Sequence, residues 1–168
     1  TGKIAAATAT MYLLMATGAN SHSCLLNFGI AGAHNHPLGE LFLIHKIHEE
    51  STGKNSYPQT AIRHALPTEG LTTVDQACDN YPNSGLVDME AAGVMQAASV
   101  VIPCEQLCFL KIISDNSEHG SCHINKKQIL TWSEQQSKNI EKTITALHKL
   151  SAQEHQHHVL PQWDKWLN

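Results

Sequence analysis

An apolar run that stops abruptly on polar residues constrains the fold of this chain most. Residues 107–113 read Leu-Cys-Phe-Leu-Lys-Ile-Ile, and Ser114, Asp115 and Asn116 follow directly. A short apolar run with such a boundary is typical of a strand buried inside an α/β protein. In open α/β sheets, ligands bind at the carboxyl ends of the strands. The run therefore predicts a strand that carries Asp115 to a ligand-binding edge.

A second carboxylate lies where an extended segment turns into a helix. Residues 86–88 favour a strand, and Glu90 begins a predicted helix of small residues that extends to Val101. Two carboxylates at the ends of neighbouring elements suit a reaction in which one protonates the substrate and the other steadies charge. Simpler interpretations stay open. Asp115 could cap the loop after its strand, because Asp beside Asn and Ser is common in turns. Glu90 is favoured in the first turn of any helix by the helix dipole, and Met89 could be a core residue.

The rest of the chain alternates between predicted helices and strands. Small residues at 29–32 let the backbone approach another group closely, although they could also be packing glycines. Because the strands are apolar on both faces and alternate with helices, the sequence predicts one domain over 1–168 in which helices cover both faces of a central sheet. The remaining predicted elements are helices over 1–15 and 125–150, the second long and amphipathic, and strands over 24–28, 41–44 and 70–74, with a polar stretch over 45–63 and a turn-rich connector over 79–85.

Composition narrows the possible partners and the compartment. The net charge is -4 and only 15% of the residues are charged, so the sequence shows no basic character of the kind that binds nucleic acid. No apolar run approaches the ~20 residues of a membrane span, so we expect no membrane partner. The five cysteines are odd in number and lack a CxxC pair, which favours thiols in a reducing, cytoplasmic compartment. The histidines cluster at 34–36 and 155–158 without cysteine or carboxylate partners at zinc spacing, so we predict no metal and no cofactor.

Several short motifs follow one another in an order that resembles one protein family. The segments are Gly29-Ile30-Ala31-Gly32 (G-x-A-G), Leu38-Gly39-Glu40 with the apolar run 41–44 (L-x-x-G-D), Lys46-Ile47-His48-Glu49 (R-Y-H-D), Val87-Asp88-Met89-Glu90-Ala91-Ala92 (V-E-M-E-x-A) and Ile113-Ser114-Asp115 (I-S-D). In this order they resemble the nucleoside phosphorylase/nucleosidase superfamily, especially 5'-methylthioadenosine/S-adenosylhomocysteine nucleosidases and futalosine hydrolases. The resemblance covers about residues 1–150 and implies a three-layer α/β/α sandwich with a mixed central sheet.

The resemblance implies a purine nucleosidase that hydrolyses the N-ribosyl bond of a nucleoside such as methylthioadenosine, adenosylhomocysteine or futalosine. Asp115 would be the acid that protonates N7, so that the purine leaves as a neutral species, and Ser114 would orient it. Glu90 would accept hydrogen bonds from the ribose hydroxyls, and Met89 would pack on the sugar. Family members are typically dimers, so a homodimer is also expected. The implied substrate-binding residues are Met89, Ser114, Gly29, Ile30, Ala31, Gly32, Cys78 and His48.

The chain also departs from the family pattern. Residues 1–6 are similar to the start of a helix that normally follows several N-terminal strands, which carry the water-activating glutamate. We therefore expect an N-terminally shortened member, with an open sheet edge near residues 25–28 that favours self-association. Cys78 stands where an aromatic base-stacking residue is usual.

Two alternative functions stay open. One is a purine nucleoside phosphorylase. Phosphorylases of the family hold phosphate with an arginine just before the glycine loop and a hydroxyl within it, whereas this chain has Asn27 or Phe28 and Ile30 there. Water is therefore the better nucleophile. The other alternative is a catalytically impaired, nucleoside-binding relative.

Overall fold

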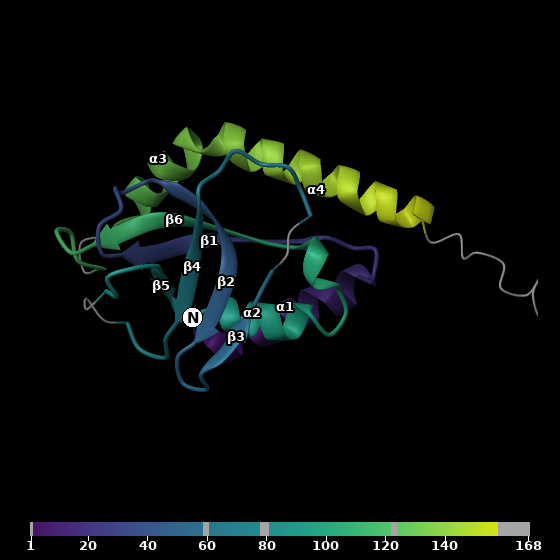
Figure 1. Ribbon diagram of the computed structural model, residues 1–168, viewed down its shortest axis with the longest axis horizontal. Helices are drawn as coiled ribbons and strands as arrows, with labels where there is room; N and C mark the ends of the chain where they lie inside the picture. The colour runs from purple at the N-terminus through teal and green to yellow at the C-terminus, as the bar shows by residue number, and fades with distance from the viewer. Residues whose placement is uncertain (1, 59–60, 78–80, 122–123, 158–168) are drawn as a thin grey trace, which may run out of the picture.

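The protein is built around one six-stranded mixed sheet with helices on both faces (Figure 1). The computed structural model describes residues 2–58, 61–77, 81–121 and 124–157. The prediction of an α/β fold with a mixed central sheet between helices is confirmed. In chain order the elements are α1 (Lys3–Thr17), β1 (Leu25–Ala33), β2 (Leu41–Glu49), β3 (Lys54–Ser56), β4 (Thr68–Thr73), β5 (Leu86–Asp88), α2 (Ala91–Ala98), a 3-10 turn (Cys104–Gln106), β6 (Leu107–Asn116), α3 (Lys126–Gln135) and α4 (Ser137–His157).

The sheet closes on itself. Its strand order is β3-β2-β4-β5-β1-β6, and the start of β2 also pairs with β6. Five strands, β2, β4, β5, β1 and β6, therefore form a ring, with β3 attached to the far end of β2. Within this ring β1 runs parallel to β6, and Leu25 pairs with Leu107. The two predicted buried strands thus lie side by side at the centre of the fold.

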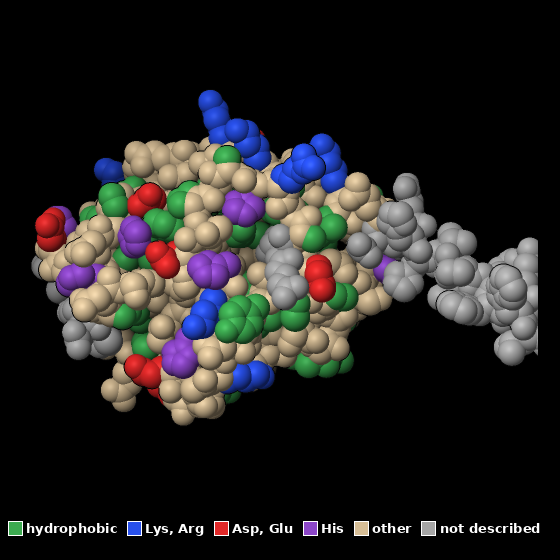
Figure 2. All heavy atoms as spheres, in the orientation of Figure 1, with side chains coloured by type: hydrophobic (Ala, Val, Ile, Leu, Met, Phe, Trp, Pro, Cys, Tyr) green, Lys and Arg blue, Asp and Glu red, His purple; other side chains and the backbone are tan. Residues whose placement is uncertain are grey.

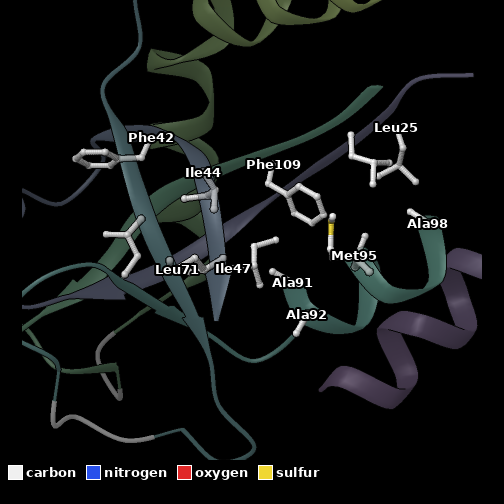
Figure 3. Packing of buried hydrophobic residues seen from close by; sticks show 14 of the residues in the cluster. Leu25, Phe42, Ile44, Ile47, Leu71, Ala91, Ala92, Met95, Ala98 and Phe109 are labelled. Carbon is white, nitrogen blue, oxygen red and sulfur yellow. The ribbon is translucent and has the colours of Figure 1, made fainter. Parts of the chain in front are cut away.

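Two apolar clusters hold the helices to the sheet. On one face, Phe109 of β6 and Ile44 of β2 belong to the cluster that includes Met95 of α2 and Leu14 of α1 (Figure 3). On the other face, Leu110 and its neighbours pack with α4. The small residues of α2 have a direct reason, because a Cβ added at Gly93 would lie 2.2 Å from the backbone oxygen of Lys3. The two helices on that face can touch only because this position carries no side chain.

Several predicted elements differ from the structure. The strand predicted over 24–28, for example, continues through the small residues 29–32 to Ala33. The strand predicted over 41–44 continues to Glu49, because its polar second half pairs with β4 on one side and β3 on the other. The long helix predicted over 125–150 is interrupted at Gln136, whose Nε2 donates a hydrogen bond of 3.0 Å to the backbone oxygen of Gly39. None of the described helices is both long enough and apolar enough to span a bilayer.

Candidate active site

Asp115 lies near the end of β6, opposite a glycine on the neighbouring strand. The register of the β1–β6 pair shifts between Ala31 and Gly32, and Gly32 faces Asp115 after the shift. A Cβ added at Gly32 would lie 2.6 Å from Oδ2 of Asp115 and 2.4 Å from Cε1 of Tyr81. Both contacts are far inside normal van der Waals separation. The close approach expected of residues 29–32 is therefore made at Gly32, towards the Asp115 carboxyl and a tyrosine ring.

Both oxygens of the Asp115 carboxyl are held by hydroxyl donors. The Tyr81 hydroxyl donates to Oδ2 at 2.5 Å, and the Ser114 hydroxyl donates to Oδ1. Asp115 is only 7% exposed, so these bonds are formed largely out of water. The carboxyl is thus fixed in orientation before any ligand arrives.

Glu90 occupies the N-cap position of α2 but does not cap the helix with its side chain. Asp88 does this instead, since its Oδ2 accepts a hydrogen bond of 2.9 Å from the Ala91 N–H. Thr73 Oγ1 accepts a second bond, of 3.1 Å, from the Ala92 N–H. Glu90 Oε1 accepts a 2.9 Å hydrogen bond from the Gly2 N–H, and Oε2 accepts none from the described residues. The half-buried Glu90 carboxylate is therefore not used to cap α2.

A buried ion pair lies beside these carboxylates. Lys111 Nζ is 2.8 Å from Asp88 Oδ2, and Lys111 is only 2% exposed. Asp88 Oδ1 also accepts a 2.7 Å bond from the Thr73 hydroxyl. A Cβ on Gly29 would lie 3.1 Å from Lys111 Nζ, so Gly29 leaves space for the ammonium group. The pair explains why a lysine is tolerated inside the apolar run, because the Asp88 carboxylate neutralises its buried charge. It also links β6 to β5.

The two predicted catalytic carboxylates line one cavity of about 260 Å³. Met89, Ser114 and the segment 30–32 line it as well, together with Tyr81 and the apolar side chains of Val74 and Val87. A second hollow of about 400 Å³ shares Val74, Tyr81 and Val87 with the first. An apolar cavity with a few convergent polar groups is the usual form of a small-molecule site.

The charged side chains that line the cavity are carboxylates. The cavity's described lining includes no lysine or arginine. Figure 2 shows several Lys and Arg side chains along the edge of the molecule where α3 and α4 run, and others near the centre and the lower edge of the view. Lys138, Lys142 and Lys149 of α4 line a different hollow, together with Arg63. The cavity therefore presents carboxylates and hydroxyls to a ligand, without a basic side chain among the described residues.

Two other predicted site residues, Gly29 and His48, do not line this cavity. Gly29 contacts Lys111, as described above, and His48 lies on β2, where its Nδ1 is 3.1 Å from Asn55 Oδ1. Cys78 falls outside the described residues. No cluster of three or more histidine, cysteine or acidic residues that could hold a metal ion occurs in the described part of the chain.

Tyr81 was missed by the sequence interpretation. The pattern predicted a site without an aromatic residue, because Cys78 takes the expected place. The structure brings in an aromatic ring three positions later, from the turn-rich connector. A tyrosine between Asn80 and Pro82 is ordinary loop composition, and its bond to Asp115 cannot be read from the chain.

Comparisons with known proteins place this fold. Neither the scan of protein-family models nor the search of curated proteins finds a match. Among solved structures, the chain is similar to a selenomethionine structure of a protein from Chlamydia trachomatis that is named MTAN, for methylthioadenosine nucleosidase. The identity is 24% and the TM-score 0.57, over 73% of this chain and 63% of that one. It is also similar to the 5'-methylthioadenosine/S-adenosylhomocysteine nucleosidase (MTAN) of Colwellia psychrerythraea in complex with adenine, with 17% identity and a TM-score of 0.61, over 89% and 74% of the two chains.

A plant structure gives the same result. The apo 5'-methylthioadenosine nucleosidase of Arabidopsis thaliana has 17% identity to this chain and a TM-score of 0.62, over 89% of this chain and 69% of that one. These likenesses assign the chain the fold shared by these nucleosidases. The chain spans 63% of the Chlamydia protein's length.

Proposed function

We propose that this protein is a purine nucleosidase-like hydrolase that cleaves the N-ribosyl bond of a nucleoside such as methylthioadenosine, adenosylhomocysteine or futalosine. One observation carries the proposal: the buried Asp115 carboxyl, held by two hydroxyls, lines the same cavity as the Glu90 carboxylate. The fold supports it, because the similar structures described above are nucleosidases, one of them in complex with adenine.

Asp115 is the proposed acid. Its proton passes to a ring nitrogen of the purine, and the bond between that base and the anomeric carbon breaks. Water adds to the carbon and releases one proton to solvent, from which the Asp115 carboxyl is protonated again. The base then departs as a neutral molecule, which is a far better leaving group than its anion. The bonds from Ser114 and Tyr81 support this role, since they fix the carboxyl and remain available to the carboxylate that forms.

Glu90 and Met89 are proposed to hold the ribose. A carboxylate that accepts hydrogen bonds from two neighbouring hydroxyls fixes the sugar and favours the positive charge that grows on it. The hydrogen bonds at the start of α2 support this assignment. Asp88 and Thr73 accept from the first helical N–H groups, so Glu90 is not needed to cap the helix. Met89 presents an apolar, polarisable thioether to the same cavity.

Water is the proposed nucleophile. A phosphorylase must bind a phosphate anion, for which proteins use arginine, lysine or a helix N-terminus. The described lining residues include no lysine or arginine, and Lys111, buried beside them, is paired with Asp88. Purine release in phosphate-free buffer, with free ribose as the second product, is the expected result.

We also propose that the protein is a cytoplasmic homodimer. Over residues 25–31, β1 pairs with β6 on one side, while among the described strands β5 reaches only Gly32 and Ala33 on the other. Phe28 is 40% exposed on this segment. An incompletely paired strand with an exposed aromatic side chain favours association with a second copy. Light scattering on a gel-filtration column tests this, and a monomer at all concentrations would contradict it. The cysteines are odd in number and include no CxxC pair, which suits a reducing compartment.

The acid assignment is tested by Asp115→Asn, measured as adenine release from methylthioadenosine. Asparagine keeps the shape but has no transferable proton, so release should fall by at least ~10²-fold while nucleoside binding survives. Glu105→Gln, the same kind of change at an exposed position, is the matched control and should leave the rate unchanged. Wild-type turnover by Asp115→Asn would show that another group supplies the proton.

A further inference from the structure

Tyr81 is buried although it comes from a turn-rich connector. It is 7% exposed and lines both the cavity that contains Asp115 and the neighbouring hollow of about 400 Å³. Its ring edge lies against Gly32, where no side chain could be added without a clash. A tyrosine ring enclosed this way has little rotational freedom, so its hydroxyl is delivered to a fixed point. That point is Oδ2 of Asp115, at 2.5 Å.

We propose that Tyr81 is a positioning residue for the acid: its hydroxyl holds the Asp115 carboxyl in the cavity and stabilises the carboxylate left after proton transfer. The inference rests on the proposed function. The Asp115 proton moves to the purine nitrogen, the Tyr81 proton stays on the phenol oxygen, and the existing O–H bond strengthens as negative charge appears on the carboxyl. No other bond is made or broken at Tyr81.

Ser114 alone cannot supply the same constraint. It precedes Asp115 in the chain, so it moves with β6 when that strand moves. Tyr81 belongs to a different segment, 34 positions away. Its bond therefore fixes the carboxyl relative to the opposite wall of the cavity, which Val74 and Val87 also form. Two donors from independent segments determine the orientation of the carboxyl plane, whereas a neighbouring hydroxyl leaves it free to tilt.

The hydroxyl and the ring of Tyr81 can be tested separately. Tyr81→Phe removes one O–H and keeps the ring against Gly32. A hydrogen bond to a charged group is worth a factor of about 10 to 150. Because this bond strengthens when the proton leaves, kcat for adenine release should fall by about that factor while KM changes less than about threefold. Tyr12→Phe, the same change at an exposed tyrosine of α1, should leave both constants unchanged.

A kcat for Tyr81→Phe within twofold of wild type would overturn the proposal. So would a rise in KM at unchanged kcat, because that pattern belongs to a group that binds substrate and transition state equally. Thermal unfolding of each variant confirms that the comparison is made between folded proteins.

A second measurement separates this inference from the proposed function. If the wild-type protein releases no purine from any of the nucleosides, the proposed function fails. A double-mutant cycle on urea unfolding, with Tyr81→Phe and Asp115→Ala, then decides whether the Tyr81 hydroxyl positions the carboxyl. Coupling of at least about tenfold in the unfolding equilibrium constant is expected for one buried, charge-assisted bond. Additive effects of the two substitutions would refute the positioning role.

Discussion

Gly32 is the position where a single methyl group should do most damage to the candidate site. The Cβ of Gly32→Ala would lie 2.4 Å from Cε1 of Tyr81 and 2.6 Å from Oδ2 of Asp115. Carbon atoms in good contact are about 3.5–4.0 Å apart, so the ring must retreat by more than about 1 Å. The carboxyl must shift too, and the hydrogen bond between the two side chains cannot survive in its present form.

The expected magnitudes follow from this geometry. Overpacking a filled site costs typically about 1–3 kcal/mol, and loss of glycine flexibility in the unfolded chain returns about 0.4–1 kcal/mol. The net destabilisation of up to about 2.6 kcal/mol corresponds to a Tm lower by up to roughly 10 °C for a chain of this size. Displacement of a catalytic group by about 1 Å is worth about 10²-fold in rate, so adenine release should fall by at least that much.

Gly70→Ala is the matched control. Gly70 also lies within a strand, β4, but a Cβ there would meet no atom within 4 Å, and its φ is not positive. This variant should keep wild-type activity and be as stable as wild type or slightly more so. Both variants are compared by thermal unfolding and by adenine release from methylthioadenosine. Wild-type stability and rate in Gly32→Ala would refute the described arrangement of Tyr81 and Asp115.

Three further perturbations test other parts of the structure. Glu90→Ala should weaken binding of methylthioadenosine by about 10- to 150-fold in titration calorimetry, because the ribose loses a charged acceptor, while free adenine binds nearly as before; equal weakening of both would indicate a structural role. Lys111→Met leaves the Asp88 carboxylate buried without its partner, and urea unfolding should show a loss of about 3–5 kcal/mol. The hydrogen bond from Lys3 holds the pKa of Glu49 below its usual value of 4.5. Since the folded pKa is the lower one, this bond adds stability above about pH 4.5 that is lost as pH falls through the folded pKa, so the Tm difference between wild type and Glu49→Gln should shrink on acidification.

Local patterns predicted the central strands and the helix after Glu90. The apolar run before Asp115 indicated a buried strand, and the small residues after Glu90 indicated a closely packed helix. The two carboxylates that these patterns singled out line one cavity in the structure, and their catalytic roles stay predictions. The strand and the helix depend on near neighbours in the chain, which is why they are readable from sequence.

Features that depend on distant partners could not be predicted. The second half of β2 has a polar pattern, and its buried Glu49 is stable in a strand only because Lys3, Thr52 and Gln96 bond to it. Gln136 carries no helix-breaking signal, yet it leaves the helix to bond the Gly39 oxygen. Within the site, the hydrogen bond from Tyr81 to Asp115 likewise joins residues 34 positions apart, so the local sequence does not reveal it. Each is set by tertiary contacts that override local preference.

The closed ring of strands also sets the order in which the chain can fold. β1 and β2 precede β6 in the chain, yet both pair with it. The parallel pair of Leu25 with Leu107 can form only after β6 has been synthesised. A growing chain on the ribosome therefore carries two apolar strands without their central neighbour until residue 116 has emerged. Such long-range closure belongs to topologies that fold slowly and depend on protection from aggregation meanwhile. The same topology that fixes Asp115 beside Gly32 therefore predicts that a chain truncated before β6 cannot form this sheet.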